Sequence, residues 1–305
     1  MRDVFVKELM AHACIDKRVM LVTGDLGFGV LNDYSTGLPN QFINAGVAEQ
    51  NMAGVAAGLA FEGRNVFTYS IANFPTFRCL EQIRNDILYH DLSVNIVAIG
   101  GGFSYGSLGM SHHATEDVAV MRAMPGLRLF APCDDIETAA IVAQMVEDPA
   151  PSYLRLDKSK VSRAGFENFT RGKLRQMRQG EDVALVSYGG IVSEAMLAAD
   201  YLAELGISCS VYSAHTIKPF DSETMLNLAR TYPTVATIEE HIATGGLGSL
   251  AADIFLDAHL MPNKFTKFCL PDSFSSIVGS QEYLRHCYGL DAKSIAESLS
   301  KLVDR

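Results

Sequence analysis

FINAGVAEQNMAGVAAGLA, residues 42–60, is the stretch that decides the fold of this chain. A short strand-like run is followed there by a helix-like run of small and apolar residues, in which Glu49 is the one carboxylate. Apolar surroundings disfavour the charged form of a carboxylate. Glu49 could therefore share a proton with a ligand nitrogen near neutral pH. The plain alternative is a first-turn glutamate, favoured by the helix dipole on a closely packed helix.

The rest of the chain alternates between strand-like and helix-like patterns. Buried parallel strands are predicted at 19–23, 66–69, 93–99, 127–132 and 151–156, with helices at 3–14, 46–61, 78–89, 116–123 and 135–147. The alternation then resumes with strands at 182–190, 208–213 and 234–241 and a helix at 192–205. Such alternation predicts parallel sheets with helices on both faces. We expect an α/β protein with two doubly wound domains, 1–160 and 181–305, joined by a polar linker at 161–180.

Composition excludes several classes of function. The 305 residues carry a formal net charge of −10 and no broad basic tract, which argues against nucleic acid as a partner. A small basic cluster in the linker, formed by Arg171, Lys173, Arg175 and Arg178, is expected to be solvated. No apolar run reaches the roughly 18 residues of a membrane span, so no membrane partner is expected.

The cysteines point to a reducing compartment. The six cysteines form no C-x-x-C pair, and no His/Cys/Asp cluster has the spacing of a zinc site. We therefore expect reduced thiols in a cytoplasmic protein and no metal ligands supplied by this chain.

Residues 42–60 resemble the pyrimidine-domain signature of the transketolase family of thiamine diphosphate enzymes. Three further segments resemble that family in the same order: VTGDL at 22–26, RCLEQIRND at 78–86 and MSHHATED at 110–117. The resemblance implies a transketolase-like pyrimidine-binding domain followed by a transketolase carboxy-terminal domain. It also implies that Glu49 contacts a ring nitrogen of the cofactor's aminopyrimidine and drives formation of the reactive imino tautomer.

The resemblance also implies an aromatic pocket for the aminopyrimidine. The candidates are Phe74, then Phe77, with Tyr69 on the preceding strand; a stacked ring would bind the planar heterocycle and exclude water. Asp25 follows a strand, in the crevice where open α/β sheets bind ligands, and by resemblance it faces the cofactor. The alternatives are ordinary core aromatics and a helix-capping aspartate.

His112 matches the family histidine that reaches the sugar hydroxyls and the oxyanion formed on the donor carbonyl. An imidazole can donate to that oxygen or move protons at neutral pH. His113 stands where many relatives have glutamine, and both histidines are candidates for substrate binding. The alternative for His112 is a loop histidine without a role, although the nearby glycines favour a functional loop.

Three departures from the family concern the substrate. Leu108 replaces an aspartate that contacts a substrate hydroxyl, and a histidine expected near residues 100–102 is absent. Arg155 and Lys158 lie near the position of a phosphate-binding arginine, with Lys158 in the slot itself. Lysine binds phosphate as a point charge and not as a bidentate fork. These departures argue against the common pentose phosphate pair and leave a modified or nucleotide-linked sugar open.

One half of the family's active site is missing from the sequence. Transketolases hold the cofactor's diphosphate through a metal bound by a Gly-Asp-Gly motif and a later asparagine, and this chain has no Gly-Asp-Gly. We therefore expect a partner, the amino-terminal subunit of a split transketolase, to bind the diphosphate with Mg²⁺ or Ca²⁺. By family analogy, the assembly would be an α2β2 heterotetramer.

Three functions follow as hypotheses. The favoured one is transfer of a two-carbon ketol unit from a ketose to an aldose. The second is the beta subunit of a 2-oxo-acid dehydrogenase or a related pyruvate-using synthase, which shares the fold and the glutamate. The third is a structural or regulatory subunit without catalysis, against which the retention of Glu49 and His112 argues.

Overall fold

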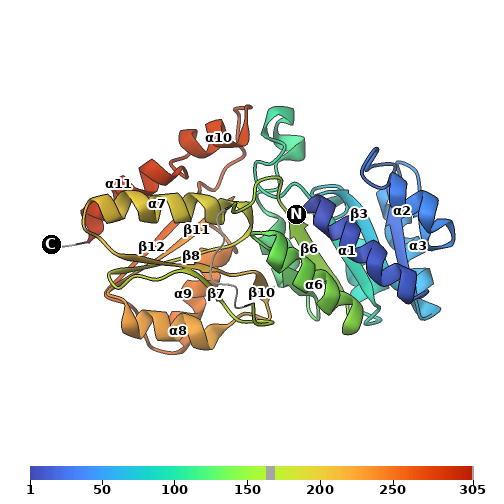
Figure 1. The fold of residues 1–305 in the computed structure, drawn as a ribbon, viewed down its shortest axis with the longest axis horizontal. Coiled ribbons are helices and arrows are strands. Elements are labelled where there is room, and N and C mark those ends of the chain that lie inside the picture. The colour runs from blue at the N-terminus through green and yellow to red at the C-terminus, as the bar shows by residue number, and fades with distance from the viewer. Residues whose placement is uncertain (163–168, 304–305) are drawn as a thin grey trace.

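The computed structural model describes residues 1–162 and 169–303, which form two α/β units side by side (Figure 1). The first unit contains strands β1 (Val19–Thr23), β2 (Phe42–Asn44), β3 (Asn65–Ile71), β4 (Val94–Ile99), β5 (Arg128–Phe130) and β6 (Ser152–Leu156). Its helices are α1 (Arg2–Ile15), α2 (Asn32–Gly37), α3 (Glu49–Phe61), α4 (Leu80–Gln82), α5 (Asp117–Ala123) and α6 (Asp135–Glu147), and α4 continues into a π-helical turn at Ile83–Leu88.

The second unit repeats this plan. Its strands are β7 (Arg175–Arg178), β8 (Val183–Ser187), β9 (Cys209–Ser213), β11 (Thr234–Ile242) and β12 (Lys264–Leu270), whereas β10 (Thr216–Lys218), which follows β9 in the chain, belongs to the sheet of the first unit. Its helices are α7 (Val192–Glu204), α8 (Ser222–Thr231), α9 (Leu247–Asp257), α10 (Gln281–Cys287) and α11 (Ala292–Leu302). Figure 1 shows α7 and α11 on one side of the sheet and α8 and α9 on the other.

Both sheets are parallel except at one edge. The first has the order β10-β5-β6-β4-β3-β1-β2 and the second β12-β11-β8-β9-β7. The antiparallel members are β10, which pairs with β5, and β7, which pairs with β9. Because β10 comes from the second half of the chain, it joins the two units through the backbone. The predicted doubly wound α/β class is confirmed.

Alternating side chains on the central strands fill two separate cores in the first unit. Val66 on β3 faces α3 and packs with Met52 and Ala56. The next side chain, Phe67, faces the opposite side and packs with residues of α1 and α6, as does Tyr69. Successive side chains of a strand point to opposite faces of its sheet, so Tyr69 and α3 lie on different sides.

The structure differs from the expected linker in one respect. Residues 163–168 of the predicted linker lie outside the described residues, but β7 falls within its second half, where no strand is expected. Arg175 in this strand is buried, and its guanidinium bonds to Asp134 at 2.7 Å and to Glu137 at 3.3 Å. The expectation of a solvated basic cluster is therefore wrong for Arg175, because buried carboxylates of the first unit face it.

Among the described residues, no helix is both long enough and apolar enough to span a membrane.

Candidate functional site

The candidate site lies where β1 and β3 end. Gly24 follows β1 and Asn73 follows β3, and strands of a parallel sheet end at a common edge, where open α/β sheets bind ligands. The glutamate at the start of α3 reaches this edge. A Cβ added to Gly24 would lie 3.5 Å from the Glu49 Cγ, in ordinary van der Waals contact, which places the glutamate directly beside the end of β1.

Glu49 is buried and paired with an arginine. Its side chain is 4% exposed, and its Oε2 atom accepts a bond from the Arg78 guanidinium at 2.8 Å. Arg78 lies just before α4, and its side chain is 49% exposed, so the pair connects a buried anion to the surface. The expected apolar surroundings of Glu49 thus include one cation that sequence reasoning missed.

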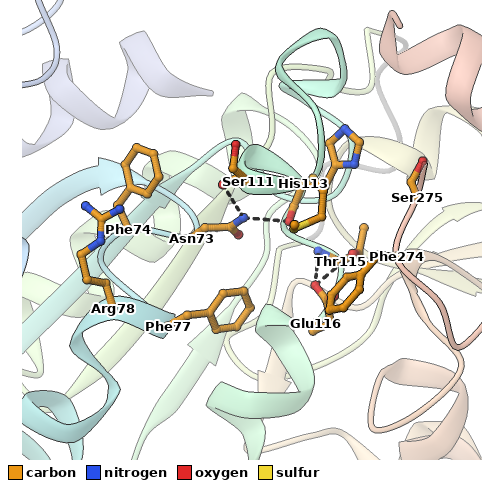
Figure 2. A pocket seen from close by; sticks show the side chains of 11 residues that line it. Asn73, Phe74, Phe77, Arg78, Ser111, His113, Thr115, Glu116, Phe274 and Ser275 are labelled. Carbon is orange, nitrogen blue, oxygen red and sulfur yellow. Dashed lines mark hydrogen bonds between the residues drawn. The ribbon is translucent and has the colours of Figure 1, made fainter. Parts of the chain in front are cut away.

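The same arginine lies against the predicted aromatic residue. The guanidinium carbon of Arg78 is 4.7 Å from the centre of the Phe74 ring, which is a cation–π contact (Figure 2). The edge of the His112 ring meets Phe74 with the ring centres 5.3 Å apart. Glu49, Arg78, Phe74 and His112 therefore form one continuous chain of contacts from the buried carboxylate to the histidine loop.

His112 is placed to accept or donate a proton. Its Nδ1 atom lies 3.0 Å from the Ser111 hydroxyl, and its ring is 6.3 Å from that of Tyr105. Partial burial, and then the neighbouring His113, lower the pKa of His112 below its ordinary value. The shift favours the neutral imidazole, which can act as a base.

A cavity of about 310 Å³ adjoins this chain of contacts. Phe74, Phe77, Arg78 and His113 are among the residues that line it, with Phe274 from the second unit on the far side (Figure 2). The Asn73 amide fixes its histidine loop by donating to the backbone oxygens of Ser111 at 3.0 Å and His113 at 2.8 Å. Sequence reasoning missed Asn73 because only its position after β3 could have indicated it.

His113 has a different environment from His112. It is buried, and its Nε2 atom lies 3.1 Å from the backbone oxygen of Gly106. Because a carbonyl only accepts, Nε2 carries the proton and Nδ1 is left as an acceptor without a partner among the described atoms. Its ring meets Phe103 edge to face at 5.1 Å.

Tyr69 and Asp25 are not brought to this cavity. Tyr69 stacks with Phe5 at 6.1 Å and lines a separate cavity of about 220 Å³ with Tyr105 and Leu26. Asp25 occupies the turn after β1, where its carboxylate accepts from the Asn44 amide at 2.9 Å. The position of Tyr69 follows from strand alternation, which directs it away from α3.

The two predicted phosphate-binding cations also separate. Arg155 is 1% exposed and lies between Asp117 at 3.1 Å and Asp157 at 3.2 Å, so this position offers no guanidinium to a substrate. Lys158 is exposed and its ammonium lies 3.6 Å from the centre of the Tyr105 ring, which links it to the His112 loop.

One buried cluster brings metal-ligating atoms together among the described residues. It consists of Cys133, Asp134 and Glu137, whose ligand atoms lie within 4.8 Å of one another. The Arg175 guanidinium already contacts both carboxylates. The guanidinium thus supplies the positive charge that balances these carboxylates. The two ion pairs connect the second unit to the first.

Comparison with protein families assigns nearly the whole chain. Residues 1–163 match the model of the transketolase pyrimidine binding domain, and residues 172–295 match that of the transketolase C-terminal domain.

Curated relatives match over the full length of the chain. It is 35% identical to the 6-deoxy-6-sulfo-D-fructose transketolase subunit of Clostridium sp. strain MSTE9, covering 100% of this chain and 95% of the relative. It is 34% identical to an apulose-4-phosphate transketolase subunit of Phocaeicola vulgatus, and the match covers 100% of this chain and 97% of the relative. It is 29% identical to the 1-deoxy-D-xylulose-5-phosphate synthase of Desulforudis audaxviator, but covers only 47% of that protein.

Solved structures show the same fold. A split-gene transketolase, described as an inactive beta4 tetramer, superimposes with a TM-score of 0.89 at 33% identity and covers 100% of this chain and 99% of its own. A transketolase of Pichia stipitis superimposes with a TM-score of 0.82 at 19% identity, and 45% of that chain is covered.

Proposed function

The chain belongs to the transketolase family, as the carboxy-terminal subunit of a split transketolase, and from that premise we propose how its residues act. Glu49 holds and activates the aminopyrimidine of thiamine diphosphate, Phe74 and Phe77 contact its ring, and His112 moves protons at the oxygen atoms of the sugar. The contact chain from Glu49 through Arg78 and Phe74 to His112 is the observation that carries this proposal.

The residues present fit the planar, nitrogen-rich end of the cofactor. A buried carboxylate that already accepts an N–H bond from a planar cation, beside an aromatic ring, suits a ring nitrogen and an amino group. When bound, thiamine diphosphate supplies the nucleophilic carbon that takes up a two-carbon ketol unit. The carboxylate of Glu49 would hold a proton at the ring nitrogen, while Phe74 excludes water from one face.

A partner subunit completes the site in this proposal. The sequence has no Gly-Asp-Gly motif, so the amino-terminal subunit would bind the diphosphate together with Mg²⁺. Exposed apolar side chains around the cavity support coverage by another chain; they include Phe77, Leu108, Met110, Phe274 and Val278, with exposed fractions from 38% to 73%. We propose an α2β2 heterotetramer for the complete enzyme.

The donor is proposed to be a ketose other than the common pentose phosphates. Leu108, in the position of the hydroxyl-binding aspartate of many relatives, is 54% exposed and cannot accept a hydrogen bond from a substrate. Lys158 offers a single point charge to an anionic group of the sugar. The relatives named above act on ketoses that differ from each other, which is consistent with variation at these positions.

The reaction type is tested by a donor screen on this chain assembled with its amino-terminal partner. Ketoses with phosphate, sulfonate or no anionic group are offered with an aldose acceptor, and pyruvate is offered separately. We expect a product lengthened by two carbons from at least one ketose, and no release of carbon dioxide from pyruvate. Turnover of pyruvate without any ketose transfer would instead support the dehydrogenase or synthase alternative.

A further inference from the structure

The Arg78 side chain makes the two contacts that the proposed function assigns to the cofactor ring. It donates an N–H bond to the buried Glu49 carboxylate at 2.8 Å and places its flat guanidinium over Phe74 at 4.7 Å. A guanidinium is a planar N–C–N group with N–H donors in its plane. A protonated aminopyrimidine offers the same planar N–C–N edge to a carboxylate and the same flat face to an aromatic ring.

We propose that Arg78 is a placeholder for the aminopyrimidine: it neutralises Glu49 in the cofactor-free chain and is displaced when the cofactor binds. This inference rests on the proposed function of Glu49. The proposal places the heterocycle on the same carboxylate oxygen, Oε2, and over the same face of Phe74, so the ion pair opens before the heterocycle binds.

Burial explains why a placeholder is needed. Leaving a carboxylate that is 4% exposed without a partner costs free energy of folding. Before the cofactor binds, a cation must therefore balance the negative charge. Among the described residues, Arg78 is the cation within ion-pair distance of Glu49. The arginine thus balances the charge of the buried carboxylate until the cofactor binds.

Exposure explains how the placeholder can leave. The Arg78 side chain is 49% exposed and is one of the residues that line the cavity, where it lies beside Phe74 (Figure 2), so its guanidinium can turn into solvent without unpacking the core. It lies where a 3-10 turn at Phe77–Cys79 passes into α4 and then into a π-helical turn. Local helix irregularities of this kind occur often at functional sites.

Cofactor affinity distinguishes a placeholder from a cofactor-binding residue, because the two predict opposite directions. Thiamine diphosphate with Mg²⁺ is titrated calorimetrically into the assembled enzyme carrying wild-type Arg78, Arg78→Gln or Arg78→Lys. If Arg78 competes, removing its charge tightens binding by about tenfold, the scale of a charge-assisted hydrogen bond with one half-exposed partner. The lysine variant, which keeps the charge without the planar fork, should fall between the other two.

Two controls isolate the ion pair. Arg84→Gln removes an exposed arginine from the same helical segment, where it bonds to Asn85 at 2.8 Å, and reports the general effect of lost positive charge near an anionic ligand. In a Glu49→Gln background, Arg78→Gln should no longer tighten binding, because no ion pair remains to compete.

Thermal unfolding supplies a second readout. Arg78→Gln should lower the melting temperature of the cofactor-free enzyme, and saturating cofactor should remove that difference, since the ion pair is absent from the bound state. Equal or weaker cofactor binding by Arg78→Gln would overturn the placeholder while leaving the role of Glu49 intact. Near-normal turnover by Glu49→Gln would instead overturn the proposed function itself, because that function rests on proton transfer by this carboxylate.

Discussion

Glu49→Gln is expected to lower the turnover of the assembled enzyme by about 10²- to 10⁴-fold, the range that a positioned proton-transfer group contributes. Glutamine fills the same space at the start of α3 and can still bond to a ring nitrogen, but it cannot hold a proton there. Arg78 loses its partner in this variant. Because its side chain is 49% exposed, water can solvate the guanidinium instead. The fold should therefore survive, and steady-state kinetics with a saturating ketose measure the loss.

The matched control for this variant lies just beyond the far end of the same helix. Glu62→Gln removes an exposed carboxylate immediately after α3, far from the sheet edge at which Glu49 lies. Circular dichroism should show both variants folded, and Glu62→Gln should turn over normally. Near-normal turnover in Glu49→Gln would rule out the proposed activation of the cofactor by this carboxylate.

His112→Asn is expected to lower turnover by about 10²-fold while cofactor affinity changes little, because its proposed role concerns the substrate and not the aminopyrimidine. Asparagine keeps a side chain that can hydrogen bond and removes the group that titrates near neutral pH. Calorimetry for the cofactor and kinetics for the ketose separate the two effects. A large loss of cofactor affinity with unchanged turnover of the bound enzyme would contradict this assignment.

The pH profile of kcat/KM tests the same role of His112, because the direction of its pKa shift predicts where the acid limb of the profile lies. Burial lowers the pKa of His112, so the base form persists below the ordinary histidine range and the acid limb of the profile should lie there. His113 contributes in the same direction as the second cause. Replacing it by His113→Gln should therefore move the acid limb to higher pH, and His112→Asn should remove that limb.

Local pattern was sufficient to predict the elements that position the site. The buried strand at 19–23 and the helix that begins near Glu49 follow from runs of apolar and small residues, and the structure places them at Val19–Thr23 and Glu49–Phe61. The resemblance to transketolases, which rests on motifs along these elements, is confirmed by the family models.

The contacts between residues that are distant in sequence could not be predicted from local pattern. The pairing of Glu49 with Arg78 joins residues 29 positions apart, and no local pattern distinguishes Arg78 from a solvated arginine. Arg155 lies in a predicted buried strand and Arg175 in the predicted polar linker, and both side chains are buried because carboxylates from other elements face them. Tyr69 is adjacent to the aromatic pocket in sequence, but strand alternation sends it to the α1 side.

The division of the active site between two chains is tested most directly by titrating thiamine diphosphate and Mg²⁺ in a calorimeter. The titration is made into this chain alone and into its mixture with the amino-terminal subunit. We predict heat of binding only in the mixture, because this sequence lacks the Gly-Asp-Gly motif through which the family holds the diphosphate. Tight binding by the isolated chain would contradict the split site and would require a diphosphate-binding surface within these 305 residues.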